Sequence, residues 1–224
     1  MPVYENTYRS YEGSFRAHFR WLTILQQEFR VLLHSRIFIL FMLIGLLHVI
    51  LRLLQLVAYD VIVQDPNNPL SGFLRQLSAL TVNEKTFFDF IRIQGPLLLV
   101  TSIYAGGGMI CNDFGNNLME VYFSKPLSWR DYLLGKLGTL LTIGFGFTAL
   151  PALVLLLLHN LLLPGMETIR TSISWAPGIL GFSAAICIPC ALTILASSAL
   201  LRSQNYASIA IFMVLVANHI FVVL

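Results

Sequence analysis

Long apolar runs constrain this chain more than any other feature of its sequence. Five of them are each about 18 to 24 residues long, enough for an α-helix that rises 1.5 Å per residue to cross a hydrocarbon core of about 30 Å. They cover approximately Ile37–Ala58, Ile93–Cys111, Leu137–Leu158, Gly178–Leu201 and Ala207–Leu224. The sequence therefore predicts an all-α membrane protein, built as a single transmembrane domain with a helical bundle of about five spans.

The composition identifies a lipid bilayer as the solvent of this bundle. Of the 224 residues, 57% are hydrophobic and only 11% are charged, whereas about a quarter of an average soluble domain is charged. A globular fold has too little interior to bury so much apolar surface, so lipid must solvate it. The formal net charge of +3 gives no indication of a nucleic-acid partner, and we expect none.

The positions of the basic residues predict how the spans are oriented. Five arginines precede the first span, and Lys125, Arg130 and Lys136 lie between the second span and the third. In the 59–92 connection, three cations are outnumbered by four acidic residues. Because basic residues next to spans favour the cytoplasmic side of a membrane, we expect the N-terminus and the 112–136 segment to lie in the cytoplasm.

The segment that precedes the first span has the pattern of an amphipathic helix. Its stripe at helical spacing consists of Phe15, Phe19, Leu22, Leu25, Gln26, Phe29, Leu32 and Leu33. Arg16, Arg20 and Arg30 fall largely off this stripe, and Trp21 is suited to headgroup depth. The pattern predicts a helix that lies in the membrane surface. The alternative is a soluble helix that packs against another subunit.

The 112–136 segment is too polar for a span and too apolar for a free linker. Its first part places Leu118, Val121 and Tyr122 on one face of a short helix, and Pro126 then breaks the helix. Ser128, with Asp131 three residues later, is typical of a capping box, so we expect a second helix that continues into the third span.

Such a helix–break–helix segment is suited to transmitting motion from a soluble partner into two spans. The alternative is an ordinary interfacial loop held by lipid.

Signatures of soluble enzymes are absent from the sequence: there is no phosphate-binding loop, no zinc-protease motif, no nucleophile elbow and no dinucleotide fingerprint. Gly106–Gly108 lies at a span, where glycines favour close helix packing over phosphate binding. Cys187 and Cys190 have the C-x-x-C spacing of redox and metal sites. Their apolar neighbours and the nearby Pro189 favour a buried, structural interpretation, and we expect no cofactor or metal in this chain.

His48 and Arg52 are the candidate polar site within the first span. They lie four residues apart, so they share one face of the helix. An ionisable residue inside a membrane is a functional candidate, and a place on a substrate path or at a helix contact is one interpretation. The other is that Arg52 extends its long side chain to the headgroups.

The 112–136 segment resembles the cytoplasmic coupling region of type 2 ABC transporter permeases. In that family, acidic residues precede G-T-L-E, two apolar residues, a small residue, proline, a V/L-S-R triplet and finally L-L-G-K. The matching residues here are Asp113, Glu120 (six before the proline), Ser124, Pro126, Leu127–Ser128 and Leu133–Lys136. The departures are Asn117–Leu118 for the usual Gly-Thr, Lys125 before the proline, and Trp129 in place of a basic residue, although Arg130 follows.

The resemblance implies a permease of the exporter type in the cytoplasmic (inner) membrane, paired with a second permease copy or homologue and with ABC ATPase subunits. ATP and Mg²⁺ would bind to the ATPase, so no catalytic residue is expected in this chain. The family has six spans, one more than this sequence predicts. The residues that the resemblance assigns to the ATPase-coupling interface are Asp113, Glu120, Ser124, Pro126, Arg130, Gly135 and Lys136.

Other classes of membrane protein fit the apolar runs as well. A secondary transporter or channel without an ATPase would need an ion site within the membrane, and the second to fifth apolar runs contain almost no ionisable residues. An intramembrane enzyme would need clustered Asp, Glu or His at one depth, which the sequence does not indicate. A non-catalytic membrane anchor or assembly factor is the remaining alternative.

Overall fold

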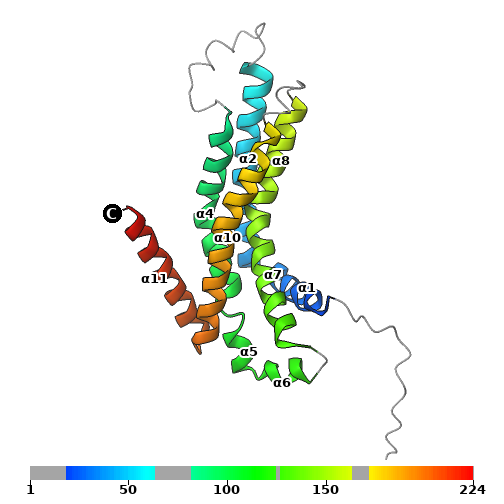
Figure 1. Cartoon of the computed structure of the whole chain (residues 1–224), viewed down its shortest axis with the longest axis vertical. Helices are drawn as coiled ribbons and strands as arrows, with labels where there is room; N and C mark the ends of the chain where they lie inside the picture. The colour runs from blue at the N-terminus through cyan, green and yellow to red at the C-terminus, as the bar shows by residue number, and fades with distance from the viewer. Residues whose placement is uncertain (1–18, 64–81, 125–126, 163–171, 224) are drawn as a thin grey trace, which may run out of the picture.

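The computed structural model describes residues 19–63, 82–124, 127–162 and 172–223. Within these residues every regular element is helical, and the long helices run side by side as a bundle (Figure 1). The elements are α1 (Arg20–Leu33), α2 (Arg36–Val57), the π-helix η1 (Ala58–Val63), α4 (Glu84–Gly106), α5 (Cys111–Gly115), α6 (Leu118–Phe123), α7 (Trp129–Phe147), α8 (Ala149–Leu162), α10 (Trp175–Leu200) and α11 (Gln204–Val223). The predicted all-α membrane fold is confirmed.

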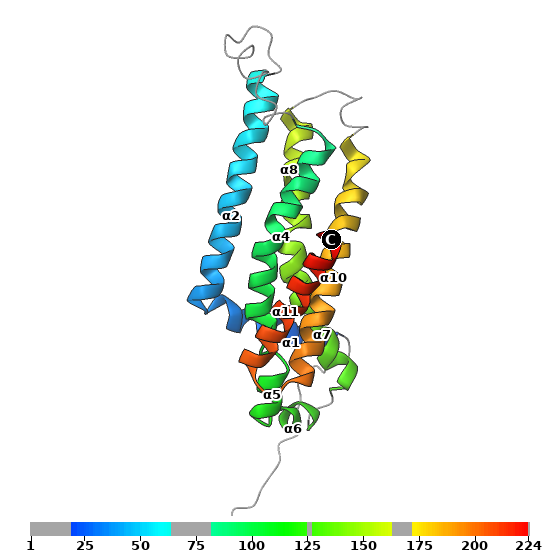
Figure 2. The ribbon, with the colours of Figure 1, turned by 90° about the vertical axis from the view of Figure 1, so that its left-hand side faces the viewer.

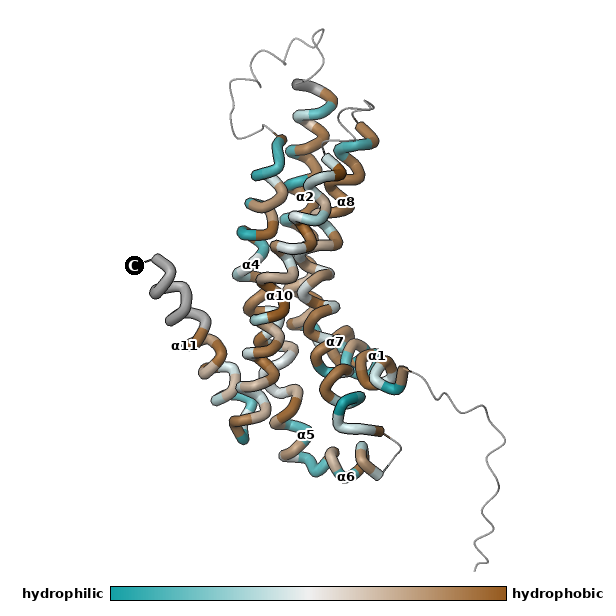
Figure 3. Tube along the Cα trace, in the orientation of Figure 1, coloured by the Kyte–Doolittle hydropathy of each residue, from teal (hydrophilic) through white to brown (hydrophobic). Residues whose placement is uncertain are grey.

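Four stretches of the described chain are long and apolar enough to cross a membrane: Arg36–Val61, Glu84–Gly115, Trp129–Leu162 and Trp175–Leu200. Apolar residues predominate along most of the bundle (Figure 3). The fifth predicted span coincides with α11, which is helical from Gln204 and leans away from the other helices in Figure 1. Each of the five apolar runs of the sequence therefore coincides for most of its length with helix.

The two ends of the bundle differ in the elements that they carry. The coupling end carries α1, α5 and α6, and the far end is where α2 and α8 finish and α4 begins (Figures 1 and 2). At the edge of the bundle in Figure 2 stands α2, with only 11% of its most apolar stretch buried. This chain therefore leaves most of the apolar surface of α2 uncovered.

The second span begins earlier than its apolar run indicated. We predicted a start near Ile93, but α4 starts at Glu84 because Asn83 and Thr86 form a capping box, with Thr86 N donating to Asn83 Oδ1 at 3.3 Å and Asn83 N donating to Thr86 Oγ1 at 3.1 Å. Exposed charged residues occupy its first turns. Hydrophobicity alone locates the membrane-embedded part of a helix, not the capped turns beyond it.

The third span consists of two helices, α7 and α8, that meet at Thr148. Pro151 has no N–H to donate to the carbonyl of Phe147, where α7 ends. Thr148 Oγ1 donates to Gly144 O at 2.8 Å, which gives the interrupted turn a side-chain hydrogen bond. As predicted, α7 is continuous from the 112–136 segment into the membrane.

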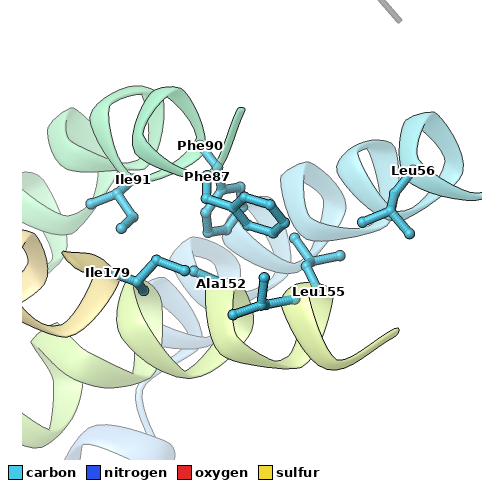
Figure 4. Packing of buried hydrophobic residues seen from close by; sticks show 8 residues of the cluster. Leu56, Phe87, Phe90, Ile91, Ala152, Leu155 and Ile179 are labelled. Carbon is cyan, nitrogen blue, oxygen red and sulfur yellow. The ribbon is translucent and has the colours of Figure 1, made fainter. Parts of the chain in front are cut away.

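Apolar packing holds the bundle together at both ends. At the far end, Phe87, Phe90 and Ile91 of α4 meet Leu155 of α8 and Ile179 of α10 in a buried cluster, which Figure 4 shows at close range. Nearer the coupling end, Leu140 and Ile194 belong to a second buried cluster. The spans are thus fixed against one another by interdigitated side chains rather than by polar bonds alone.

Small residues allow the close helix contacts. A Cβ atom at Gly106 would lie 2.4 Å from Ile194 Cγ2, and one at Gly144 would lie 2.8 Å from Cys187 Sγ. Cys187 is buried and Cys190 partly buried, and both are free thiols. Cys187 belongs to a buried apolar cluster, and Cys190 packs against another, so both thiols lie at packing contacts between helices.

We predict that Gly106→Ala destabilises the bundle, because a methyl group there meets two buried side chains. Overpacking of this kind costs about 1–3 kcal/mol, which should lower the melting temperature of the detergent-solubilised protein. Gly95→Ala on the same helix is the matched control, since nothing lies within 4 Å of its Cβ position. An equal effect of the two substitutions would contradict the packing role of Gly106.

Candidate functional site: an exposed helix and a buried ion network

Two short helices connect α4 to α7 at the coupling end (Figure 1). We predicted one helix before the break at Pro126, but the structure has two, α5 and α6. They are separated because Asn117 adopts a left-handed conformation with φ of 53°, which asparagine tolerates better than most residues. Pro126 itself lies outside the described residues.

Most of α6 faces away from the bundle. None of its residues is buried, and Leu118, Val121 and Phe123 are exposed together with Glu120. Tyr122 connects α6 to α7, because its ring packs against Tyr132 with centroids 5.6 Å apart. Burial raises the pKa of the Tyr122 hydroxyl, so this contact is made by a neutral ring. The helix thus presents an apolar surface with one carboxylate.

The start of α7 is capped as the sequence predicted. Asp131 N donates to Ser128 Oγ at 3.2 Å, and Ser128 N donates to Asp131 Oδ2 at 3.1 Å. Next to this cap, Trp129 and Arg130 are exposed, with the Arg130 guanidinium 5.5 Å from the centroid of the Trp129 ring. The exposed Ser124 closes α6 by donating to Val121 O at 2.9 Å. These residues border α6 on the side of α7.

Behind this surface lies a buried ion network centred on Lys136. Its ammonium nitrogen is 2.6 Å from Glu28 Oε1 of α1, 2.7 Å from Asp113 Oδ2 of α5 and 2.9 Å from Met109 O. The side chain of Lys136 is only 1% exposed. An ammonium group has three donors, and here each of them has an acceptor on a different part of the chain.

Tyr132 completes the network on the same helix. Its hydroxyl donates to Asp113 Oδ2 at 2.8 Å, so Asp113 receives bonds from two successive turns of α7. Two carboxylates face one ammonium group, and they keep 19% and 10% of their side-chain surface exposed. Their residual contact with solvent lowers the cost of the excess negative charge, while loss of the cation would leave both carboxylates without a counter-charge.

Helix α1 crosses α7 at a glycine. A Cβ atom at Gly135 would lie 2.7 Å from Ile24 Cβ and 3.0 Å from Trp21 O, so only glycine permits the observed approach. The side of α1 that carries Ile24 and Glu28 therefore faces α7. Leu22 and Leu33 of the predicted apolar stripe do not take part in this contact and are exposed, and Phe15 and Arg16 lie outside the described residues.

The predicted coupling residues therefore fall into two groups. Asp113, Gly135 and Lys136 are buried and connect α1, α5 and α7, whereas Glu120, Ser124 and Arg130 are exposed. Only the exposed group can touch a partner in the observed conformation, and the buried group can act only by positioning it. Glu28 was not predicted as a site residue, because a single carboxylate on an amphipathic helix has the appearance of a solvated charge.

His48 and Arg52, the polar pair predicted within the first span, make contacts with different residues. His48 Nδ1 lies 2.5 Å from Gln94 Oε1, and the imidazole stacks on Phe90 with ring centroids 5.0 Å apart. Arg52 Nη1 donates to Gln55 Oε1 at 2.7 Å. Thus His48 joins α2 to α4, whereas Arg52 is held by its own helix near the far end.

Comparison with known proteins places the chain in a family. The family model described as "ABC-2 family transporter protein" matches residues 22–224, which includes every described element except the first two residues of α1. The search of curated proteins found no significant match, and neither did the search of solved structures.

We predict that Lys136→Met lowers the free energy of unfolding by about 3–5 kcal/mol, because it leaves buried carboxylates without a counter-charge. Combining it with Glu28→Gln and Asp113→Asn should restore much of the loss. Arg130→Met, which removes an exposed cation from the same helix, should change stability by no more than about 0.5 kcal/mol. Equal losses for the two methionine variants in chemical denaturation would show that the network contributes nothing.

Proposed function

This chain belongs to the ABC-2 family of transporter proteins, and we propose that it is the membrane-spanning permease subunit of an ATP-binding cassette exporter. In this proposal, separate ATPase subunits bind ATP and Mg²⁺ and carry out the hydrolysis. A second permease copy or homologue completes the membrane part. The chain itself has no catalytic residue and serves as the moving part of the assembly.

The observation that carries the proposal is the position of α6. It is an exposed apolar helix with no buried residue, and it lies at the end of the bundle where two spans meet (Figure 1). A contiguous exposed apolar surface beside polar groups is typical of a protein-interaction site. We assign this surface, with Glu120, Ser124 and Arg130, to the contact with the ATPase.

The buried network supplies the mechanical connection behind that contact. A displacement of α6 acts on α5 through the short Asn116–Asn117 turn, and Asp113 of α5 is bonded to both Tyr132 and Lys136 of α7. Lys136 is in turn bonded to Glu28 of α1. Charge-assisted hydrogen bonds are short and strong, so α1, α5 and the first turns of α7 move as one unit.

The same unit connects to the spans without a flexible linker. Helix α7 continues directly through the membrane towards α8, and α4 ends only four residues before α5. ATP-driven closure of the ATPase subunits would therefore tilt two spans together. Such rigid-body motion of packed helices is a common mode of switching.

In this proposal the protein lies in the inner membrane, and its coupling end faces the cytoplasm. The five arginines before the first span and the cations of the 112–136 segment support that orientation. The exposed apolar residues of α1, among them Leu22 and Leu33, support its placement in the membrane surface, where lipid would cover them.

We predict that Glu120→Lys weakens the association of the purified permease with its ATPase and lowers the ATP turnover of the complex. The substitution reverses the one carboxylate on the exposed surface of α6 and leaves the buried network intact, so the melting temperature of the free permease should not change. The measurements are co-purification and ATP turnover of the reconstituted complex.

Asp89→Lys is the matched control for this charge reversal. Asp89 is also exposed, but it lies near the start of α4 at the far end, so assembly and turnover should stay as in the wild type. If Glu120→Lys and Asp89→Lys behave alike, or if no ATPase of the ABC type associates with the chain, the proposed function fails.

A further inference from the structure

A second buried pair of ionisable groups lies at the far end of the bundle. Asp60 Oδ2 is 2.7 Å from His159 Nδ1, and the side chains of Asp60 and His159 are 0% and 6% exposed. Asp60 belongs to η1 and His159 to α8, so the contact joins the end of the first span to the end of the third. The proposed coupling mechanism does not use this pair.

The backbone that carries Asp60 is unusual. The six residues of η1 form a π-helix that extends α2, whereas we had predicted a connection from Tyr59 onwards. Such π-helical turns are rare, and they occur frequently at functional sites. The change in helical period at Ala58 sets the direction of Asp60 relative to the rest of α2.

Aromatic rings surround the imidazole. Trp175 of α10 stacks on His159 with ring centroids 6.3 Å apart and planes 20° from parallel, and Phe87 of α4 meets the imidazole edge-on at 6.5 Å. Four parts of the bundle therefore meet at this pair: η1 at the end of α2, and the helices α4, α8 and α10. Phe87 also belongs to the apolar cluster of the far end (Figure 4).

No other ion pair involves Asp60 or His159 among the described residues, and Asp60 Oδ1 is buried there without a hydrogen-bond partner. Among the described residues, the remaining titratable or charged groups at this end are the partly buried Tyr59 on η1, the exposed Glu84, Lys85, Asp89 and Arg92 on α4, and Arg52 on α2, which is bonded to Gln55. On α8, His159 is the only such residue, and on α10 the nearest is Cys187. Within the part of the chain that the structure describes, no other charged side chain forms an ion pair with either member.

We propose that Asp60 and His159 form a proton-binding site that controls how firmly the far ends of the helices hold together. When His159 takes a proton from the solution at Nε2, the imidazolium and the Asp60 carboxylate neutralise each other. When that proton returns to solution, a net negative charge remains in a dry site with Asp60 Oδ1 unsatisfied, a costly arrangement. Protonation of the imidazole therefore strengthens the contact between η1 and α8, and loss of the proton weakens it.

The proton binding itself depends only on the geometry of the pair. Its effect on transport rests on the proposed function, in which the far end faces away from the cytoplasm. In that setting, the pH on the non-cytoplasmic side of the membrane would set the ease with which the far ends of α2 and α8 separate during transport.

Trp175 is a built-in reporter for this site. The chain has three tryptophans, and replacing Trp21 and Trp129 by Phe leaves only the indole that stacks on His159. A cation over an indole ring interacts with its π-system, so we expect Trp175 emission in nanodiscs to fall as acid protonates the imidazole.

His159→Gln should abolish this titration. Asp60→Asn removes the counter-charge of the imidazolium, so its emission curve should differ from that of the parent. If either single variant fails to fold, the Asp60→Asn, His159→Gln double variant supplies a neutral hydrogen-bonding pair, which should show no titration. His34→Gln, at an exposed histidine of the coupling end, should titrate as the parent does. A flat curve in the parent, or an unchanged curve in His159→Gln, overturns the proposal.

The functional part is tested on the ATPase–permease complex in proteoliposomes, with pH varied only on the side of the far end. We expect ATP turnover to change several-fold between pH 5 and pH 8 and this dependence to disappear in His159→Gln. If Trp175 emission changes with pH but ATP turnover does not, the pair is only a structural contact and its proposed controlling role is overturned. If no ATPase associates at all, the proposed function fails, whereas the emission curve still decides whether the site binds a proton.

Discussion

The arrangement of the coupling end depends on one buried ammonium group. Lys136 is bonded to a carboxylate of α1, to a carboxylate of α5 and to the carbonyl of Met109, three positions that apolar packing alone would not fix relative to one another. A buried ion network of this kind contributes little net stability compared with apolar residues in place of all its members, but loss of the cation alone is costly and the geometry of the network is specific. Specificity is what a coupling element needs, since it must keep α6 at one angle to the spans.

The sequence predicted the helical part of the fold well, because the number and length of the apolar runs leave a membrane-spanning bundle as the only stable solution. Helix ends were predicted less well. The capped start of α4 at Glu84 and the π-helical extension of α2 through Val63 lie outside or at the edge of the apolar runs. A cap such as Asn83 with Thr86 is readable in sequence, but a single such pair is too common to identify a helix start alone.

The candidate site was predicted in its residue types but not in its burial. Lys136 lies at the edge of a span, where a cation usually contacts headgroups, and its partner Glu28 is 108 residues away in sequence. Only the crossing of α1 over Gly135 brings the two together. The Asp60–His159 pair could not be predicted for the same reason. Its two members are 99 residues apart in sequence, and they meet only because η1 packs against α8.

The central claim is that α1, α5 and the start of α7 move as one unit when the ATPase binds nucleotide. It is tested most directly by the distance between spin labels at the exposed Gln27 of α1 and Asn116 beside α5, measured in the ATPase–permease complex. A single narrow distance distribution that is the same with and without ATP is the predicted result. A distance that changes with ATP would show that α1 and the coupling segment move separately, and would contradict the role assigned to Lys136.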